Sequence, residues 1–497
     1  MSGRLRQEIS IVDIATLYDR SDAVALAELA HKREVTPGEL LDEALRRVEA
    51  LNPKLNAVTM LREKVARRLI DEGLCEGPLR GVPFLIKDLG CEAIDFPSNN
   101  GSRLFADTHY GKDSSIYARI KAAGLVTFGR TTSPEGGVGP TTEAAVYGGP
   151  THNPWNLDHT PGGSSGGAAA AVAAGILPAA HGSDGGGSVR IPASSCGLYG
   201  FKATRARLPD GPYVGEGWAG MAIDGFLTRS VRDSAVLLDA CQGPDLGAPY
   251  VAPALETGYR KAMDRPTRRL RIGFATTSLV GEAIHPECRA AVEATAKLLE
   301  SMGHMVEEAL PQADTPGMMA AWTKIVACGS ALSVESAVRR RGRPLEAGEI
   351  EGIARGAIAY ARTVSGADYL EAINKVHAYG REMAMFFERY DVLLTATLAE
   401  PPAKLGRFNH RSDDYVDYRM GPGQVFAYSP FTAAFNASGQ PAASLPLHWT
   451  AEGLPVGVQI AAAYGNDELL INLSARIEEA LPWFDKRPPV SYAALRS

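Results

Sequence analysis

Two glycine-serine clusters constrain the fold of this chain more than any other feature of its sequence. Residues 162–167 read GGSSGG, and residues 182–192 read GSDGGGSVRIP. Glycine loses much conformational freedom on folding, so such runs need a structural or chemical reason. Both are bordered by apolar sequence, including the alanine-rich stretch 168–180. A mobile linker would lie inside the core, so we expect two ordered, buried loops.

The surrounding sequence predicts an α/β fold built around one large sheet. Apolar runs typical of strands occur at 82–86, 125–128, 392–397, 442–447 and 456–461. Residues 270–310 have the pattern of a βαβ unit, and residues 311–389 are mostly helical in pattern. Because strands and helices alternate over most of the chain, helices are expected to cover the sheet.

The first 65 residues are predicted to be helical. The sequence TPGE at 36–39 is a capping box with proline at the first helical position. Apolar residues then recur at helical spacing up to Leu51 and form one stripe for packing. The pair Asn52-Pro53 predicts the end of this helix.

The glycine clusters favour a hydrolytic site over two other interpretations. Flexible loops conflict with the apolar surroundings. A phosphate-binding loop is disfavoured because neither cluster has the G-K-[ST] ending or the dinucleotide fingerprint. Glycine-rich turns do expose backbone N–H groups, which an oxyanion hole requires. Ser188, at the end of the glycine run 185–187, is then the candidate nucleophile.

A serine nucleophile needs a base, and two kinds of residue are available. His152, His159 and His181 lie near the clusters, so a histidine base remains open at this point. Lys87 is the other candidate because it directly ends the apolar strand 82–86. Lowering its pKa from about 10.4 to about 8 requires roughly 3 kcal/mol, which desolvation in a buried site can supply.

Charge and composition disfavour several classes of partner. The net charge is −6, from 51 basic and 57 acidic residues without long like-charge runs, so no nucleic-acid-binding arm is predicted. The six cysteines form no C-x-x-C motif and are expected to be buried small side chains, with no metal site. The first ten residues lack a signal-peptide pattern, and the stretch 168–180 is too short to span a membrane. We expect a soluble cytoplasmic protein.

Three motifs taken together resemble the amidase signature family. They are I-K-D at 86–88 and the two glycine clusters, in this order and at these separations. Similar stretches at 439–446 and 455–459 extend the likeness over nearly the whole chain. The resemblance implies a single compact domain with a large mixed β-sheet surrounded by helices.

The resemblance also implies how the chain is organised. A helical N-terminal region would occupy residues 1–65, and the catalytic domain would occupy residues 66–497. Within that domain, a helical segment at about 311–430 would cover the substrate pocket. The likeness suggests a homodimer.

The family's catalytic residues carry over by position. Lys87 matches the catalytic lysine, and Ser164 matches the bridging serine, which a cis peptide bond after Gly163 holds in place. Ser188 matches the serine that forms the acyl-enzyme. The amides of residues 185–188 match the oxyanion hole, and Asp184 and Arg190 look like its structural support.

The implied activity is hydrolysis of a small-molecule amide or carbamate without metal or organic cofactor. Residues 153–157, 181–182, 190–194 and 480–483 most resemble the 6-aminohexanoate cyclic-dimer hydrolases, and aryl acylamidases and urethanases are similar overall. A cyclic-dimer amide, an anilide and a carbamate are therefore all candidate substrates.

Three departures from the family pattern weaken transfer of a substrate. Gly185 replaces a larger residue, which is expected to loosen or widen the oxyanion loop. His159 replaces an arginine, and RTTS at 130–133 replaces a G-K-T-N-type run, which removes an asparagine amide near the acyl pocket.

Two other functions stay open. A glutaminase subunit of a tRNA-dependent amidotransferase shares the signature, although Leu89 and Ile191 argue against it. Residues 162–166 also satisfy G-x-S-x-G, the nucleophile elbow of α/β-hydrolases, which would make Ser164 the nucleophile of an esterase.

Overall fold

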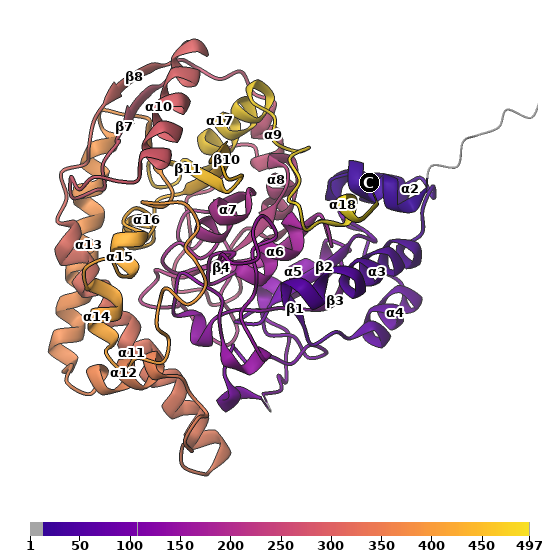
Figure 1. Ribbon diagram of the computed structural model, residues 1–497, viewed down its shortest axis with the longest axis horizontal. Helices are drawn as coiled ribbons and strands as arrows, with labels where there is room; N and C mark the ends of the chain where they lie inside the picture. Colours follow the sequence, from indigo (N-terminus) through magenta and orange to yellow (C-terminus); the bar gives the residue numbers. More distant parts are fainter. Residues whose placement is uncertain (1–12, 107, 497) are drawn as a thin grey trace, which may run out of the picture.

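The computed structural model describes residues 13–106 and 108–496 and confirms an α/β fold around a large mixed sheet (Figure 1). The strands are β1 (Val58–Thr59), β2 (Pro83–Lys87), β3 (Val126–Thr131), β4 (Ala179–Asp184), β5 (Tyr199–Lys202), β6 (Ile223–Thr228), β7 (Arg271–Phe274), β8 (Met305–Glu308), β9 (Val392–Ala396), β10 (Ala442–Trp449) and β11 (Pro455–Ala462). The α-helices are α1 (Ile14–Arg20), α2 (Ala23–His31), α3 (Pro37–Leu55), α4 (Glu63–Glu72), α5 (Ser115–Ala122), α6 (Gly166–Ala173), α7 (Arg190–Cys196), α8 (Val231–Cys241), α9 (Tyr259–Met263), α10 (Pro286–Ser301), α11 (Thr315–Arg341), α12 (Gly352–Ala361), α13 (Gly366–Phe387), α14 (Tyr415–Met420), α15 (Val425–Tyr428), α16 (Thr432–Ser438), α17 (Asp467–Ala480) and α18 (Tyr492–Arg496). Short 3-10 helices are η1 (Arg103–Phe105), η2 (Glu135–Gly137) and η3 (Ala145–Tyr147).

The described strands form an eight-stranded sheet and a three-stranded sheet. The large sheet has the order β4-β6-β5-β10-β11-β9-β7-β8, and the small one has the order β1-β3-β2. In the large sheet β7 pairs in parallel with β8 and β9, whereas the pairs that join β4, β6, β5, β10, β11 and β9 are antiparallel. The predicted βαβ unit at 270–310 is confirmed as β7, α10 and β8.

The edges of the two sheets meet where β2 lies beside β4. The ring of His181, on β4, is fully buried there, and its Nδ1 accepts a hydrogen bond from the backbone amide of Lys87 at 3.2 Å. The strand predicted at 82–86 is therefore present, but a side chain rather than a ladder of backbone bonds joins its C-terminal end to β4. This join brings the end of β2 to the second glycine cluster.

Helix α3 confirms the capping box, but it is longer than predicted. The Thr36 side chain accepts from the Glu39 amide, and the Glu39 carboxylate accepts from the Thr36 amide. The helix continues past Pro53 to Leu55, which is fully buried. The Asn52 side chain then accepts hydrogen bonds from the next two backbone amides after Asn56, so the chain leaves the helix one turn later than the proline indicated.

Helices α11, α12 and α13 confirm the helical segment predicted at 311–389. They stand together at the left of Figure 1, beside α14 to α16. In the described part of the chain, α11 is the one helix whose length and composition could span a membrane, and 56% of its most apolar window is buried inside the protein. It packs against α12, α13 and α16.

The two ends of the described chain meet. Helix α18 packs on α3, and the Arg47 guanidinium lies between the rings of Tyr18 and Tyr492, 4.3 Å from each centroid (Figure 1). The larger of two hydrophobic clusters in the described chain includes residues from Tyr18 to Trp483 along the sequence, and the smaller one packs η1 against α11 and α12. The division at residues 65 and 66 stays a prediction, and the first ten residues lie outside the described part.

Candidate active site

Lys87 ends β2 with its side chain fully buried. Its Nζ lies 2.7 Å from the Oγ of Ser164 and 2.9 Å from the Oγ of Ser183, and it donates to both. Burial lowers the pKa of Lys87 to about 7, although the carboxylates of Asp224 and Asp184 act in the opposite direction. A large fraction of this amine is therefore uncharged near neutral pH, as a base requires.

Ser164 lies in the first glycine cluster, just before α6. The peptide bond between Gly163 and Ser164 is cis, as the resemblance implied. A Cβ on Gly163 would lie 2.7 Å from backbone atoms of Thr141, so only glycine fits there. No strand leads into residues 159–165, so the strand-turn-helix context of a nucleophile elbow is absent at this described segment.

Ser188 lies at the end of the second cluster, between β4 and α7. Its carbonyl accepts a hydrogen bond from the amide of Ser165 at 3.2 Å, which ties the two clusters together. Ser164 and Ser188 line the same cavity. The geometry thus brings together Lys87, Ser164 and Ser188, the three residues that the resemblance singled out.

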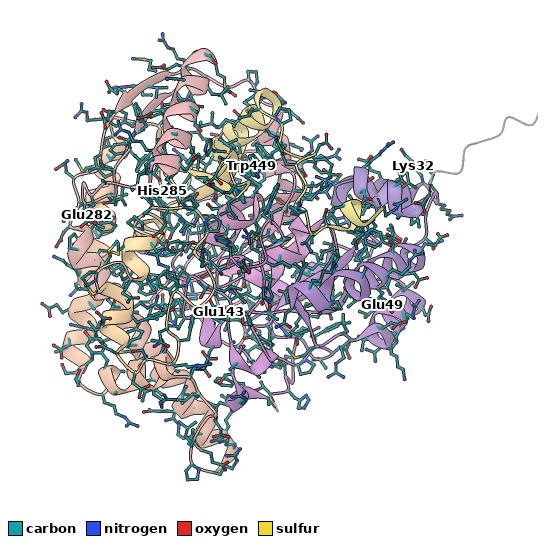
Figure 2. The ribbon with its side chains drawn as sticks, in the orientation of Figure 1. Lys32, Glu49, Glu143, Glu282, His285 and Trp449 are labelled. Carbon is teal, nitrogen blue, oxygen red and sulfur yellow. The ribbon has the colours of Figure 1, made fainter. Side chains whose placement is uncertain are left out.

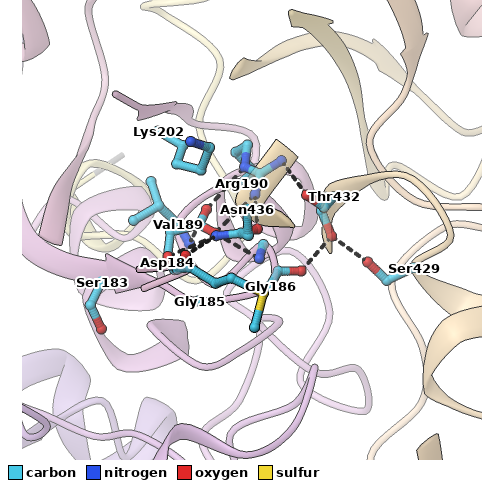
Figure 3. Close-up of polar contacts among 12 residues, drawn as sticks. Ser183, Asp184, Gly185, Gly186, Val189, Arg190, Lys202, Ser429, Thr432 and Asn436 are labelled. Carbon is cyan, nitrogen blue, oxygen red and sulfur yellow. Dashed lines mark hydrogen bonds and ion pairs between the residues drawn. The ribbon is translucent and has the colours of Figure 1, made fainter. Parts of the chain in front are cut away.

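A buried ion pair holds the second cluster in shape (Figure 3). Arg190 donates to both carboxylate oxygens of Asp184, at 3.0 and 2.9 Å, and both residues are fully buried. The carboxylate also accepts from the amides of Gly187, at 2.7 Å, and Val189, at 3.2 Å. Burial alone would raise the pKa of Asp184, but the charge of Arg190 and the hydrogen bonds from the Arg190 and Asn436 side chains hold it well below its usual value.

Residues far along the chain complete this support, and the sequence analysis missed them. The Asn436 side chain donates to the carbonyl and carboxylate of Asp184, and Thr432 donates to the carbonyl of Gly186 (Figure 3). Arg190 also donates to the side chain of Gln459. These contacts come from α16 and β11, so no local pattern could have identified them.

Ser183, a partner of Lys87, was also missed by the sequence analysis. It precedes Asp184 on β4, and successive strand residues point to opposite sides. Figure 3 accordingly shows Ser183 directed away from the Asp184–Arg190 pair. Its hydroxyl is the second partner of Lys87. The signal that could have found it is this alternation, once Asp184 is assigned to the supporting side.

The backbone amides of the second cluster are not all available to a ligand. The Gly187 amide donates to Asp184 and belongs to the support. Among the described residues, no hydrogen-bond acceptor faces the amides of Gly185, Gly186 and Ser188. These three amides beside the Ser188 side chain are the free donors of the loop.

Gly185 does not leave the loop loose, contrary to expectation. A Cβ at this position would lie 2.5 Å from the Trp218 ring, so the indole fills the space of the missing side chain. The Gly185 carbonyl also accepts a hydrogen bond from the Trp322 indole at 3.2 Å. Two tryptophans thus pack around the loop.

The other two departures have structural roles. Arg130 is fully buried, and its guanidinium donates to backbone carbonyls that include those of Lys87 and Phe96, both at 2.6 Å. It therefore fastens the end of β2. His159 forms a backbone bridge with Lys404, and burial lowers its pKa.

None of the three nearby histidines is bonded to either candidate serine. His181 Nε2 lies 3.1 Å from the Asp224 carboxylate, and the Nδ1 of His152 lies 2.6 Å from the carbonyl of Leu157. Of the candidate bases, Lys87 is the one that contacts Ser164.

The two serines open onto a cavity of about 290 Å³. Five acidic side chains contribute to its wall: Glu92, Glu135, Asp210, Asp224 and Glu351. No lysine or arginine stands among the described residues that line it, and its one histidine, His410, has a pKa lowered to about 4 by burial. The cavity is therefore suited to neutral or positively charged ligands.

Among the described residues, Cys91 is the one cysteine that lines the cavity. Within residues 13–106 and 108–496, no group of three His, Cys, Asp or Glu side chains could hold a metal ion. Four of the six cysteines are buried as expected, but Cys75 is exposed and Cys328 is half-buried.

Comparison with known proteins identifies the family of this α/β chain and the class of bond that it hydrolyses. The family model described as Amidase matches residues 39–471. The chain belongs to this family, and it is an enzyme that hydrolyses carbon–nitrogen amide bonds.

Named relatives are similar over nearly their whole length. The chain is 37% identical to a 6-aminohexanoate-cyclic-dimer hydrolase of Paenarthrobacter ureafaciens, over 94% of this chain and 96% of that one. It is 34% identical to an acylamidase of Rhodococcus erythropolis, with the same coverage. A solved 6-aminohexanoate cyclic dimer hydrolase complexed with substrate superposes with a TM-score of 0.89 at 35% identity, covering 95% of this chain and 99% of that chain.

Proposed function

We propose that the protein hydrolyses a small-molecule amide through an acyl-enzyme on Ser188, with Lys87 as the base and Ser164 as the relay. The observation that carries this proposal is the fully buried Lys87 amine, 2.7 Å from the Ser164 hydroxyl and with a pKa of about 7. An amine that is largely uncharged can accept the Ser164 proton as Ser164 takes the proton of Ser188.

The tetrahedral oxyanion is stabilised by the free amides of the loop. Those of Gly185, Gly186 and Ser188 have no protein acceptor among the described residues, so they are available as donors. Loss of one such donor typically costs about 3 kcal/mol of transition-state stabilisation. Gly187 acts differently, because its amide holds the Asp184 carboxylate.

Collapse of the intermediate requires a proton on the leaving nitrogen, because an amide anion is a poor leaving group. The Ser164 hydroxyl supplies that proton and is reprotonated by the Lys87 ammonium. Water then attacks the acyl-enzyme while the same relay accepts its proton, which releases the acid and regenerates Ser188. Ser183 holds the Lys87 amine on its other side during both steps.

The substrate is proposed to be a neutral or positively charged amide, with the amide of a 6-aminohexanoate cyclic dimer, an anilide and an aryl carbamate as the first candidates. The cavity wall supports this because it carries acidic side chains and no described lysine or arginine. The similarity to cyclic-dimer hydrolase and acylamidase sequences supports the first two of these candidates.

The glutaminase alternative is less well supported. Free glutamine carries an α-carboxylate, and the described wall of the large cavity offers that charge the Asp224 carboxylate and no lysine or arginine. The homodimer implied by the family resemblance and the cytoplasmic location expected from the sequence stay predictions.

A hydrolysis panel with the purified chain tests the proposed function. The panel contains the cyclic dimer, an anilide, an aryl carbamate and glutamine. We expect turnover of at least one of the first three, and mass spectrometry should find a fluorophosphonate label on Ser188 rather than Ser164. Ser188→Ala should abolish turnover with the far-UV circular dichroism unchanged. Labelling of Ser164 alone, or activity of Ser188→Ala near that of the wild type, would contradict the mechanism.

A further inference from the structure

Ser188 stands between two unequal spaces. One is the cavity of about 290 Å³, and the other is a cleft of about 30 Å³ that Trp322 and Phe426 help to line. A water molecule needs at least about 10–15 Å³ of such space, so the cleft holds about two waters or one small group. Whatever is bonded to a carbonyl at Ser188 must fit into these two spaces.

Trp218 is the large side chain that separates them. Among the described residues, only Gly137, Ser188 and Trp218 line both the cavity and the cleft. Glycine has no side chain and serine has a small one. The indole of Trp218 is therefore the part of the wall that decides how far a substrate can extend from one space into the other.

The backbone around Trp218 adopts an unusual conformation. The residue opens a tight turn in which the Met221 amide donates to the Trp218 carbonyl at 3.2 Å, and Gly217 and Ala222 form a bridge at its base. Trp218 and Ala219 have φ angles of 50° and 54°, in the left-handed region that side-chain-bearing residues rarely adopt. Such strain persists only where surrounding contacts determine it.

Two glycines from different elements make room for the indole. A Cβ on Gly185, in the nucleophile loop, would lie 2.5 Å from Trp218 Cζ3. A Cβ on Gly329, in α11, would lie 2.7 Å from Trp218 Cδ1. The Trp322 ring meets Trp218 edge-on, with centroids 5.8 Å apart and planes at 77°. The indole therefore packs between the nucleophile loop and helix α11.

We propose that Trp218, seated against Gly185, is a specificity-determining residue that restricts this enzyme to amides with bulk on one side of the scissile bond. The proposal rests on the proposed function. A compact or one-sided amide places its bulk in the large cavity and only a small group in the cleft. An extended amide with large groups on both sides needs space that the Trp218 indole occupies.

Two amides with the same leaving group test the proposal. p-Nitroacetanilide is bulky on one side, N-(p-nitrophenyl)benzamide is bulky on both, and each releases p-nitroaniline. Trp218→Ala should raise the ratio of kcat/KM for the two-sided amide over the one-sided amide at least about tenfold. Trp218→Phe, which keeps an aromatic ring, should shift the ratio less in the same direction and serves if the alanine variant does not fold.

A matched control distinguishes this effect from the loss of any tryptophan. Trp449, at the end of β10 and labelled in Figure 2, lines neither space, so Trp449→Ala should leave the ratio unchanged. An unchanged ratio in both Trp218 variants would overturn the proposal. Failure of the wild type to hydrolyse either anilide, the cyclic dimer and the carbamate would instead remove the proposed function.

The contact between Gly185 and Trp218 has its own test. In the wild-type background, Gly185→Ala forces the indole and the loop apart, so kcat/KM for the one-sided amide should fall at least about tenfold. In the Trp218→Ala background the added methyl has room, so the same substitution should cost less than about threefold. Equal losses in both backgrounds would show that the two residues do not act together.

Discussion

At the scale of single residues, the chemistry depends on a lysine whose surroundings oppose its charge. Lys87 has two hydroxyl partners, no carboxylate in direct contact and no exposed surface. Desolvation is the largest influence on its pKa, ahead of the attraction from Asp224 and Asp184. The burial that lowers the pKa of Lys87, and so suits it to its proposed role as the base, also makes this residue costly to bury during folding.

Replacement of Lys87 should separate activity from stability. Lys87→Met removes the base, so kcat should fall about 10³-fold or more. It also removes an amine that must give up its charge on burial, so the free energy of unfolding should rise by about 1–3 kcal/mol. Urea denaturation and anilide hydrolysis measure the two effects. Lys32→Met, at an exposed lysine labelled in Figure 2, should change neither quantity. A less stable Lys87→Met protein would contradict this account.

The pH dependence of catalysis should report the pKa of Lys87. The uncharged amine is the active form, so kcat/KM should rise as the pH increases through about 7 and then level off. The Asp224 carboxylate raises this pKa, so Asp224→Asn should move the acid limb about half a unit or more to lower pH. The asparagine oxygen can still accept from His181, so geometry is retained. An acid limb that stays in place, or moves to higher pH, would rule out this electrostatic role.

At the scale of elements, the second glycine cluster is held by a buried ion pair and not by regular secondary structure. Arg190 donates to Asp184 through Nε and Nη2, and it also donates to Gln459 and Asn436, which reach the loop from β11 and α16. The loop is therefore as rigid as the elements that hold it.

Loss of the Arg190 charge should destabilise the protein, because this side chain holds the second glycine cluster. Arg190→Met leaves the Asp184 carboxylate buried without its partner, which typically costs about 3–5 kcal/mol. Urea denaturation should show a loss of this size together with a loss of activity. As a matched control, Arg67→Met breaks the ion pairs of a side chain that is 44% exposed, and it should cost less than about 1 kcal/mol. Equal losses in the two variants would contradict the role of burial.

The sequence predicted most elements because their patterns are local. The capping box of α3 and the βαβ unit at 270–310 follow from neighbouring residues alone. The end of α3 was placed wrongly because burial of Leu55 and the side-chain bonds of Asn52 outweigh the disruption caused by Pro53. The join between the end of β2 and the large sheet depends on His181, which belongs to another strand.

At the scale of the whole molecule, the charge of the cavity wall is set by segments from distant parts of the chain. Burial raises the pKa of Asp210 to about 8 and that of Glu135 to about 7, so both carboxyls gain negative charge as the pH rises through this range. No described lysine or arginine of the wall balances them. We therefore expect negatively charged substrates to bind less well than neutral ones.

A matched pair of amides tests this expectation. A p-nitroanilide with a terminal carboxylate should show a KM about tenfold or more above that of its terminal carboxamide analogue at pH 8. The difference should shrink below pH 7, where Asp210 and Glu135 take up protons. Steady-state kinetics at both pH values measures it, with kcat for the carboxamide as the internal reference. Equal KM values at pH 8 would show that the acidic wall does not contact the substrate.

The sequence by itself determined the family, the α/β fold and the identity of the three residues that meet at the site. Each of these residues lies in a contiguous motif, and the motifs and their order can be recognised from the sequence without any spatial information. Only the tertiary structure decided that Ser183 is the second partner of Lys87, that Asp184 occupies the Gly187 amide and that Trp218 fills the space beside Gly185. The physical reason is that such contacts depend on where separate elements pack. The bond between Asn436 and Asp184 joins residues 252 positions apart, and no spacing along the chain encodes it.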